Sequence, residues 1–589
     1  MTADAWITLV VVIGVIVVLV RDLLPPAAAM AGGMVAVMAA QVIEPAEALS
    51  GFSNPAPVTV AALFVLAKAV ERSGILEPIV GGLMGDGMKE RRSLARIVAP
   101  TAVASGVLNN TPIVAMLVPQ IERWCDGNGR SPSRYLMPLS FAAILGGTLT
   151  VIGTATNVVI SGQLESAGFE PLGFFEISRV GVPIALLGLA VIALLSPVVL
   201  PARRSPRTDA EQRFREFTLE MIVEPGASVD GRTVESAGLR ALAGVFLVAL
   251  ERAGHQIAPV PPAFVLRGGD RLRFAGKATD VVDLQASSGL RSAETEHMTA
   301  LDTRRPGIYE AVIGGTSPLV GRTLKEVGFR GKYQAAALAI HRAGHRVDAK
   351  LGEVRLRVGD TLLLLSDPGF AERWSERNDF LLISGGSDVT AVIDRHRWLV
   401  ATIALSIIGA AASGLMPLVT AALVGAALLV AGRALTPGQA RDAVDLDVVI
   451  TVAAAFGVAA AVQDSGLASN IASVIAQGFE WAGPSGVLLG VTLTTVALTE
   501  LITNNAAGLL LFPIAISSAA GAQVDPRGMA IAVAVAASAS FLTPIGYQTN
   551  TMVYGPGGYH FSDYARLGAP LTTLVIVAIV VLVPIFWPM

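Results

Sequence analysis

Charged residues are scarce in this sequence. Asp, Glu, Lys and Arg make up 15% of its 589 residues, while hydrophobic residues make up 53%. A soluble protein would carry about a quarter charged residues, so the composition excludes a wholly soluble chain and predicts a polytopic membrane protein. The single cysteine, Cys125, cannot form an intrachain disulfide, and a net charge of −3 gives no basic footprint for nucleic acid.

Several functional motifs are also missing. No Gly-x-Gly-x-x-Gly follows a strand and no phosphate-cradling loop occurs, which argues against dinucleotide regulation and against an ATP-driven pump. No nucleophile, base and acid are arranged for catalysis in the apolar segments, so the chain is not expected to be an enzyme. No basic residue precedes the first apolar run, which therefore predicts a spanning helix and not a cleaved signal peptide.

Long apolar runs divide the rest into two membrane-embedded halves, 1–200 and 395–589. Five runs of spanning or near-spanning length are predicted in each half, near 6–20, 26–43, 57–71, 135–162 and 178–200, and near 398–413, 416–431, 447–462, 528–554 and 567–587. One further apolar stretch in each half, 93–124 and 485–521, is broken at its middle by polar residues. Such a break predicts a re-entrant hairpin, because irregular backbone is tolerated at membrane depth only where protein or a water-filled cavity satisfies it.

The two halves are sequence repeats. TVIGTATN (150–157) and TPIGYQTN (543–550) share Thr-x-Ile-Gly-x-x-Thr-Asn 393 residues apart, and FFEISRVGVP (174–183) matches FSDYARLGAP (561–570) 387 residues apart. The runs 135–162 and 528–554, which contain the first motif pair, are predicted to be broken helices. Five spans per half is an odd number, so the halves are predicted to have inverted topology, as in secondary transporters.

Basic residues in the loops predict the orientation. If the N-terminus is outside, Lys and Arg gather on the inside, at Arg21, Lys89, Arg91, Arg92, Arg123, Arg130, Arg134, Arg203, Arg204, Arg207, Arg395, Arg397, Arg433, Arg441 and Arg566. The outside loops carry little beyond Arg179 and Arg527. The expected location is the inner membrane, with both termini outside and residues 201–394, which collect most of the charge, in the cytoplasm.

The insertion is itself duplicated. GRTVESAGLR (231–240) recurs as GRTLKEVGFR (321–330), and RGGDRLRF (267–274) as RVGDTLLL (357–364), both 90 residues later. Two small α/β modules are therefore predicted, at 212–290 and 303–385. Each resembles the C-terminal module of regulator-of-K⁺-conductance (RCK) proteins, which implies a small cytosolic ligand as regulator.

The polar breaks of the two hairpins are the candidate site. They align through their prolines as Asn109-Asn110-Thr111 and Thr503-Asn504-Asn505. At such a tip a second half-helix begins, and its free N–H groups and dipole favour an anion, while side-chain and carbonyl oxygens suit Na⁺. Oxygens beside the tips come from Thr150, Thr156, Asn157, Thr543, Thr549 and Asn550, and the predicted unwinding points are Gly153 and Gly546.

With these residues the membrane part resembles the divalent anion/sodium symporter family of the ion transporter superfamily, over about 20–200 and 395–589. The resemblance implies one Na⁺ beside each tip and a substrate anion between the tips. It implies Na⁺ ligands at Ser105, Asn110 and Gly153 in the first half, and at Thr499, Asn504 and Gly546 in the second. The sequence departs from the family's Ser-Asn-Thr tips at Asn109, Thr503 and Asn505, and the inserted modules make it more similar to the sulfate-type branch.

The absence of Lys and Arg at either tip independently favours cation coupling, since a dianion there needs compensation beyond two dipole ends of about half a charge each. The prediction is therefore a Na⁺-coupled symporter for sulfate, or secondly a dicarboxylate, that works by an elevator-type mechanism, as a homodimer, with two or more Na⁺. A first alternative is a proton-coupled transporter or an ion/proton antiporter that uses Glu500. A second is an ion channel regulated by the modules, although Ile545-Gly-Tyr-Gln548 lacks a selectivity-filter sequence.

Overall fold

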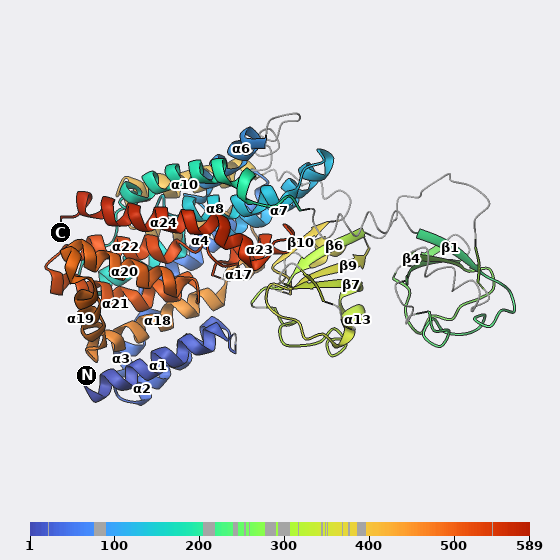
Figure 1. Ribbon diagram of the computed structural model, residues 1–589, viewed down its shortest axis with the longest axis horizontal. Coiled ribbons are helices and arrows are strands. Elements are labelled where there is room, and N and C mark those ends of the chain that lie inside the picture. Colours follow the sequence, from blue (N-terminus) through green and yellow to red (C-terminus); the bar gives the residue numbers. More distant parts are fainter. Residues whose placement is uncertain are drawn as a thin grey trace. The chain divides into compact units, whose positions relative to one another are not determined.

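The structure of the protein is a computed structural model. It describes residues 1–21, 23–75, 90–203, 218–239, 245–252, 255–257, 259–276, 290–292, 307–315, 317–342, 345–347, 349, 351–367, 369–374, 377, 379–385, 396–544 and 546–588. The chain divides into a helical unit, residues 1–203 with 391–589, and a second unit, residues 204–390. Figure 1 shows the helices of the first unit and the strands of the second.

The first half of the helical unit follows the predicted order of segments. Its elements are α1 (Ala3–Val20), α2 (Pro26–Ala39), α3 (Pro45–Ala48), η1 (Ser50–Phe52), α4 (Pro55–Ser73), α6 (Glu90–Ser105), α7 (Asn110–Gly127), η2 (Pro132–Arg134), α8 (Leu136–Gly147), α9 (Ala155–Ser166) and α10 (Ser178–Val199). The predicted hairpin 93–124 falls on α6 and α7, and the predicted broken helix 135–162 falls on α8 and α9. Predicted loop residue Lys89 lies outside the described residues.

The second half repeats this order and also shows a helix just before its hairpin, at a place that in the first half lies outside the described residues. Its elements are α15 (Arg397–Ala412), α16 (Leu418–Ala431), α17 (Pro437–Ala443), α18 (Leu446–Asp464), α19 (Leu467–Phe479), η4 (Glu480–Ala482), α20 (Gly483–Thr499), α21 (Asn504–Ala522), α22 (Pro526–Ser538), α23 (Gln548–Tyr554) and α24 (Phe561–Phe586). Helix α19 is not among the predicted segments. It is amphipathic, with Leu467, Ala468, Ala472 and Ile475 buried on one face, so no long apolar run marks it.

Capping residues explain where several of these helices begin. The Asn54 side chain accepts the N–H of Ala56 at 2.8 Å just before Pro55, the first residue of α4. Asp525 accepts the N–H of Arg527 at 2.8 Å just before α22, which also begins with a proline. Proline at the first helical position and an Asx residue before it are strong helix starts.

The helices differ in how far they could reach across a bilayer. Among the described residues, six helical segments are long and apolar enough to cross a membrane: Ala3–Val20, Pro45–Ser73, Ser178–Val199, Leu446–Asp464, Asn504–Ala522 and Phe561–Phe586. Helices α2, α15 and α16 have 14, 16 and 14 residues, less than the roughly 20 that a straight span needs. Two of these helices, α2 and α16, are shorter than the predicted runs 26–43 and 416–431, whereas α15 has the predicted length. The α21 arm, predicted as half of a hairpin, has 19 residues.

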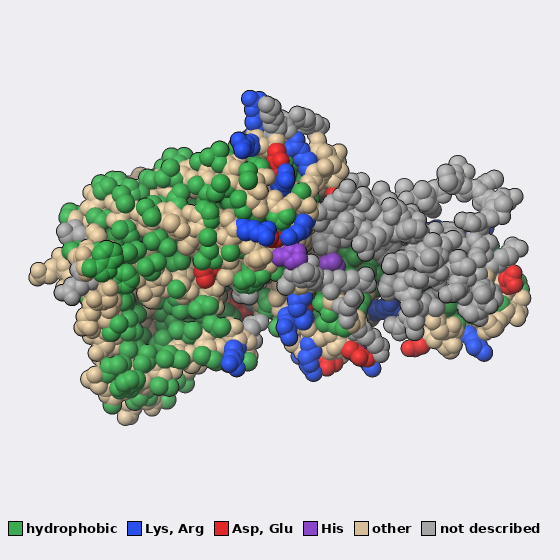
Figure 2. Space-filling view, viewed as in Figure 1, with side chains coloured by type: hydrophobic (Ala, Val, Ile, Leu, Met, Phe, Trp, Pro, Cys, Tyr) green, Lys and Arg blue, Asp and Glu red, His purple; other side chains and the backbone are tan. Residues whose placement is uncertain are grey.

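The outer surface of the helical unit is apolar. Large hydrophobic side chains are exposed at helical spacing on α1, α10 and α24, at Trp6, Val10, Ile13, Val17, Leu187, Leu194, Val198, Val577, Val581 and Ile585. Figure 2 shows hydrophobic side chains over most of the visible face of this unit, with Lys and Arg gathered toward one end. A continuous apolar surface of this kind needs lipid to cover it.

The two halves interlock along their lengths. Helix α2 packs against α18, α4 packs against α16, and α10 packs against α24, so each of these three pairs takes one helix from each half. The polar breaks also cross over, because α7 packs against α23 and α21 packs against α9. Each half therefore buries part of its apolar surface against the other half.

The second unit contains two antiparallel sheets. The first has the order β3-β2-β4-β1-β5 and the second β10-β6-β9-β7-β8. The strands of the first are β1 (Thr218–Val223), β2 (Val245–Arg252), β3 (His255–Ile257), β4 (Arg271–Gly276) and β5 (Leu290–Ser292). The second module has β6 (Gly307–Val312), β7 (Ala335–Arg342), β8 (His345–Arg346), β9 (Thr361–Ser366) and β10 (Leu382–Gly385), with α13 (Phe329–Tyr333), η3 (Leu351–Glu353) and α14 (Phe370–Trp374). The predicted boundary at 290 cuts through β5.

The duplication seen in the sequence has structural counterparts. Strand β2 pairs with β4 through a bulge between Leu247 and Ala249, and β7 pairs with β9 through a bulge between Ala337 and Ala339, 90 residues later. A buried ion pair recurs as well. Arg252 holds Asp270 through two hydrogen bonds of 2.6 Å, and Arg342 holds Asp360 through two of 2.7 Å. Because both aspartates are 1% exposed, these bidentate pairs fix the Gly-Asp turn before each strand.

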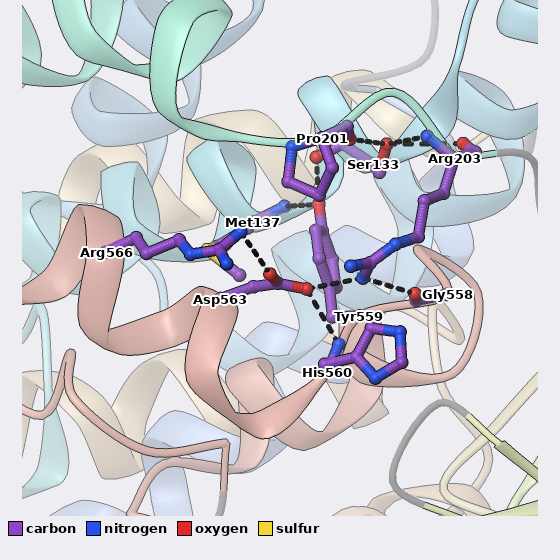
Figure 3. Close-up of polar contacts among 9 residues, drawn as sticks. All are labelled: Ser133, Met137, Pro201, Arg203, Gly558, Tyr559, His560, Asp563 and Arg566. Carbon is purple, nitrogen blue, oxygen red and sulfur yellow. Dashed lines mark hydrogen bonds and ion pairs between the residues drawn. The ribbon is translucent and has the colours of Figure 1, made fainter.

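The chain leaves the helical unit through a set of polar contacts that we name the linker junction: Ser133, Arg203, Tyr559, His560, Asp563 and Arg566 (Figure 3). The Ser133 hydroxyl donates to the carbonyl of Pro201 at 2.7 Å and accepts the N–H of Arg203 at 2.8 Å. The buried Tyr559 hydroxyl accepts the N–H of Met137 at 2.7 Å and donates to the Ser133 carbonyl at 2.5 Å. The last described residues before the insertion are thus bonded to η2, and Arg203 also bonds to Gly558 in the loop before α24.

The centre of the linker junction is a buried carboxylate. Asp563, in the first turn of α24, has a side chain only 1% exposed and forms ion pairs with both Arg203 and Arg566. It also accepts the N–H of His560 at 2.8 Å, while Arg203 donates to the carbonyl of Gly558 at 3.0 Å. A carboxylate at a helix N-terminus is favoured by the helix dipole, and here two guanidinium groups make its burial tolerable.

Candidate functional site

Both predicted tips lie where one helix ends and another begins. Helix α6 ends at Ser105 and α7 begins at Asn110, while α20 ends at Thr499 and α21 begins at Asn504. The residues before these starts, Asn109 and Thr503, are N-caps by position, but their side chains accept no helix N–H. The first N–H groups of α7 and α21 are therefore free of a side-chain cap, as an anion-binding helix start requires.

A hydroxyl and an amide meet at each tip. The Ser105 hydroxyl, buried at the end of α6, donates to Oδ1 of Asn110. In the second half Thr499 Oγ1 lies 3.4 Å from Asn504 Oδ1 and donates to the carbonyl of Ala537 at 2.6 Å. The structure thus brings together the hydroxyl and amide oxygens that the sequence assigns to each Na⁺ site.

The predicted broken helices are unwound at 148–154, and at 539–544 and 546–547. Asn157 Nδ2 donates to the carbonyls of Gly147 (3.0 Å) and Thr150 (2.9 Å). Asn550 Nδ2 donates in the same way to the carbonyls of Ser540 and Thr543, at 2.9 and 3.2 Å. The amide nitrogens of these two predicted substrate ligands therefore hold the unwound backbone.

The loop threonines connect each unwound segment to its own tip. Thr150 donates to the carbonyl of Gly106, and Thr543 donates to the carbonyl of Glu500 at 3.3 Å. Both carbonyls belong to the residue after the first arm of a hairpin. The tip and the broken helix of one half are therefore coupled by a bond at the same place in each repeat.

Gly153 and Gly546 are required for space. A Cβ at Gly153 would lie 2.6 Å from the carbonyl oxygen of Gly147. A Cβ at Gly546 would lie 2.1 Å from the hydroxyl of Ser540 and 3.0 Å from the carbonyl of Thr499. Neither glycine has a positive φ, so close packing of oxygen atoms, and not a left-handed backbone, explains these two positions.

Each tip also forms hydrogen bonds with the broken helix of the other half. Thr111 donates to Gln548 at 3.2 Å, and Thr156 donates to Asn505 at 2.9 Å. Asn110 Nδ2 donates to the hydroxyl of Tyr547 at 2.5 Å. These bonds join the two tips and the two unwound segments into one polar cluster, which we name the tip cluster.

Several members of the tip cluster are absent from the predicted site, among them Tyr547, Gln548 and Ser140. Tyr547 bonds Asn110 and lies 3.5 Å from the hydroxyl of Thr154, the residue 393 positions earlier in the paired motif. Its place after Gly546 in TPIGYQTN was a usable signal. Ser140 donates to Thr549 at 2.8 Å and to Asn550 at 2.7 Å. It is a lone hydroxyl in an apolar helix, and no local motif could have identified it.

A small cavity borders the first tip. It lies against α4, the first tip and the start of α9, and is lined by Val60, Leu63, Phe64, Leu66, Ala67, Val107, Leu108, Asn109, Ile152 and Ala155. Asn109 is the one polar side chain in this lining. The structure therefore places Asn109 toward α4, whereas Asn110 and Thr111 point to the second half.

Several buried polar atoms of the tip cluster have no partner among the described residues. They are Asn157 Oδ1, Asn504 Nδ2, Ser540 Oγ and Glu500 Oε2. None of the bonds described above for this cluster involves Lys or Arg, and Glu500 is its single carboxylate. Unsatisfied buried donors and acceptors are costly, and here they are available to bind an ion and its counter-ion.

A family match and several similar proteins indicate that the chain is a transporter. The family CitMHS, described as a citrate transporter, matches residues 11–536. A Chlamydomonas reinhardtii protein named for regulation of the sulfur deprivation response is 35% identical, over 92% of this chain and 94% of its own. The uncharacterized transporter sll0640 of Synechocystis is 33% identical, over 99% and 97%.

More distant relatives carry functional names. Sodium/sulfate cotransporter 1 of Chlamydomonas reinhardtii is 25% identical, over 92% of this chain and 85% of its own. Among solved structures, the YdaH transporter of Alcanivorax borkumensis aligns with a TM-score of 0.41 and 13% identity, over 91% of this chain and 86% of its own. The family match and the named relatives confirm the transporter assignment made from the sequence, under a family name different from the predicted one.

Proposed function

Since this chain belongs to the CitMHS citrate transporter family, whose members are membrane transporters and not enzymes, we propose that it carries a small divalent anion across the membrane together with Na⁺. Sulfate is the favoured anion and a dicarboxylate the second. The sodium/sulfate names of three relatives support this choice, and the family description keeps carboxylates in view.

The observation that carries the proposal is the tip cluster. Two helix starts without side-chain caps, at Asn110 and Asn504, each lie beside a hydroxyl and an amide oxygen. Helix N-termini attract an oxyanion, each with about half a positive charge. Two such ends compensate only roughly one of the two negative charges of a dianion. Because none of the described bonds of the cluster involves Lys or Arg, co-bound Na⁺ supplies the missing positive charge.

In this mechanism the anion receives hydrogen bonds from the first N–H groups of α7 and α21. Na⁺ binds to oxygens of Ser105 and Asn110 beside Gly153, and of Thr499 and Asn504 beside Gly546. The bonds of Thr111 to Gln548 and of Thr156 to Asn505 tie the tips and broken helices into one body. An elevator-type movement of this body past α2, α4, α16 and α18 would expose it to alternate sides.

For orientation we propose that both termini are outside and that the insertion is cytoplasmic in an inner membrane. The arrangement in Figure 1, with both chain ends toward the same end of the helical unit, supports a common side for the termini. A homodimer and a small cytosolic ligand on the modules stay predictions from the sequence.

The first test is uptake into proteoliposomes. We expect an inward Na⁺ gradient to drive uptake of labelled sulfate above that of succinate or citrate, and a K⁺ gradient to drive none. Driven uptake of a carboxylate alone would move the substrate to the second choice. Uptake that ignores Na⁺ and follows a proton gradient would replace the Na⁺ proposal with the Glu500 alternative.

Ser105→Ala and Thr499→Ala should separate ion binding from anion binding. Each removes one hydroxyl oxygen from a Na⁺ site and leaves the helix starts unchanged, so the Na⁺ concentration for half-maximal uptake should rise by roughly 10-fold. The preference for sulfate over succinate should stay the same. Measuring uptake against Na⁺ at fixed sulfate checks the first effect, and competition by unlabelled anions checks the second. A changed anion preference without a Na⁺ shift would assign these hydroxyls to the anion instead.

A further inference from the structure

The two tips are not chemically equivalent. The paired motifs align Gly106 with Glu500, and Gly147 with Ser540. At both positions the first half has no side chain, while the second half has an oxygen-bearing one. The second tip therefore has a carboxylate and a hydroxyl for which the first tip has no counterpart.

Glu500 is anchored by the unwound backbone. Its Oε1 accepts the N–H groups of Phe541 and Leu542, both at 2.8 Å. The corresponding N–H groups of the first half, on Thr148 and Leu149, are satisfied instead by carbonyls one turn back, at 3.2 and 3.0 Å. The carboxylate thus replaces the last helical turn of α22, and two N–H donors stabilise its negative charge.

Two further oxygens at this tip have no hydrogen-bond partner among the described residues. Oε2 of Glu500 and Oγ of Ser540 are buried without a hydrogen bond, and Ser540 is 0% exposed. The Ser540 hydroxyl and the Thr499 carbonyl both lie against Gly546, within 2.1 and 3.0 Å of where its Cβ would be. Carboxylate, hydroxyl and carbonyl oxygens are the ligands that a hard cation selects.

We propose that Glu500 and Ser540 make the second tip the high-affinity Na⁺ site, which fills before the first tip. This inference rests on the proposed function, because it takes Na⁺ as the cargo of both tips. A site with a unit negative charge attracts a cation more strongly than the neutral site at Ser105 and Asn110. Before Na⁺ arrives, the same charge repels a dianion, so Glu500 also disfavours binding of the anion to an ion-free protein.

Equilibrium binding of ²²Na⁺ to the purified full chain, without sulfate, tests the proposal. The wild-type protein should show a strong and a weak component. Glu500→Gln should weaken the strong component by about 10-fold or more, and Ser540→Ala by several-fold. Ser105→Ala should affect only the weak component. The matched control is Ser518→Ala, because Ser518 on α21 also has a buried hydroxyl without a partner, away from the tip; it should leave both components unchanged.

The outcomes are separable. Thermal unfolding is measured for every variant, because Glu500→Gln weakens the contacts with the N–H groups of Phe541 and Leu542. Ser540→Ala removes a hydroxyl that has no partner among the described residues, and it decides the question if Glu500→Gln does not fold. Strong Na⁺ binding that persists in Ser540→Ala and in folded Glu500→Gln would overturn the inference while Na⁺-driven sulfate uptake still upheld the proposed function. A wild-type protein that neither binds Na⁺ nor requires it for uptake would reject the proposed function itself.

Discussion

Asn110→Ala and Asn504→Ala should each reduce anion uptake by roughly 100-fold or more, since a misplacement of about 1 Å at a site can have that effect. Asn110 is 1% exposed and links Ser105 in its own half to Tyr547 in the other. Alanine would release both partners and remove the side chain at the start of α7. Asn504 is 7% exposed and has an amide nitrogen with no partner among the described residues, so its loss removes a group that is available to a ligand.

Initial rates of sulfate uptake in proteoliposomes measure this effect. The matched control is Asn470→Ala, because Asn470 on α19 bonds only the carbonyl of Gly466 among its described contacts, at 2.7 Å, outside the tip cluster. The control should keep uptake within about 2-fold of wild type, as surface substitutions usually change little. Wild-type rates in a monodisperse Asn110→Ala protein would show that the tip cluster is not the binding site.

Arg203→Ala should destabilise the helical unit by about 3 kcal/mol, because removing one partner of a buried ion pair leaves an uncompensated charge. The Asp563 side chain is 1% exposed and Arg203 is 28% exposed, so the carboxylate depends on this guanidinium (Figure 3). Arg203 also donates to the carbonyl of Gly558 at 3.0 Å. Thermal unfolding in detergent should therefore show a clear fall in the midpoint.

Arg566→Ala is the control for this prediction. Arg566 binds the same carboxylate at 3.2 Å, but its side chain is 54% exposed, so its removal should destabilise by no more than about 1 kcal/mol. Arg203→Lys should fall between the two, since an ammonium keeps the charge but not the planar guanidinium whose Nη1 donates to both Asp563 and the carbonyl of Gly558. Equal effects of Arg203→Ala and Arg566→Ala would mean that Asp563 does not depend on the linker.

The positions of most helices could be predicted because long apolar runs mark them. Helix α19 could not, since only one of its faces is apolar and it is 13 residues long. The end of α2 was also hidden, because Val42 and Ile43 continue the apolar run beyond the last helical residue, Ala39. In the insertion, the 90-residue repeat located the paired strands, but the last strand of the first module, Leu290–Ser292, lies at its predicted edge.

The tips could be predicted because their polar residues interrupt apolar sequence. Their partners could not be predicted in the same way. Ser140 and Tyr547 join the tip cluster through bonds to residues 409 to 437 positions away, and nothing in a local window specifies such a pairing. The commitment of Asn157 to its own backbone also required coordinates, since its spacing suits a ligand equally well.

The interlocking of the two halves has a consequence for how the protein is made. Asn110 meets Tyr547 only after 437 more residues have been synthesised, which at about 5–20 residues per second takes roughly 20 to 90 s. Throughout that time α2 and α4 lack α18 and α16, the helices against which they pack. The nascent first half therefore stays in the bilayer while its polar tip lacks the partners that the second half supplies. Biogenesis factors that shield such segments have the most time to act while the insertion is being translated.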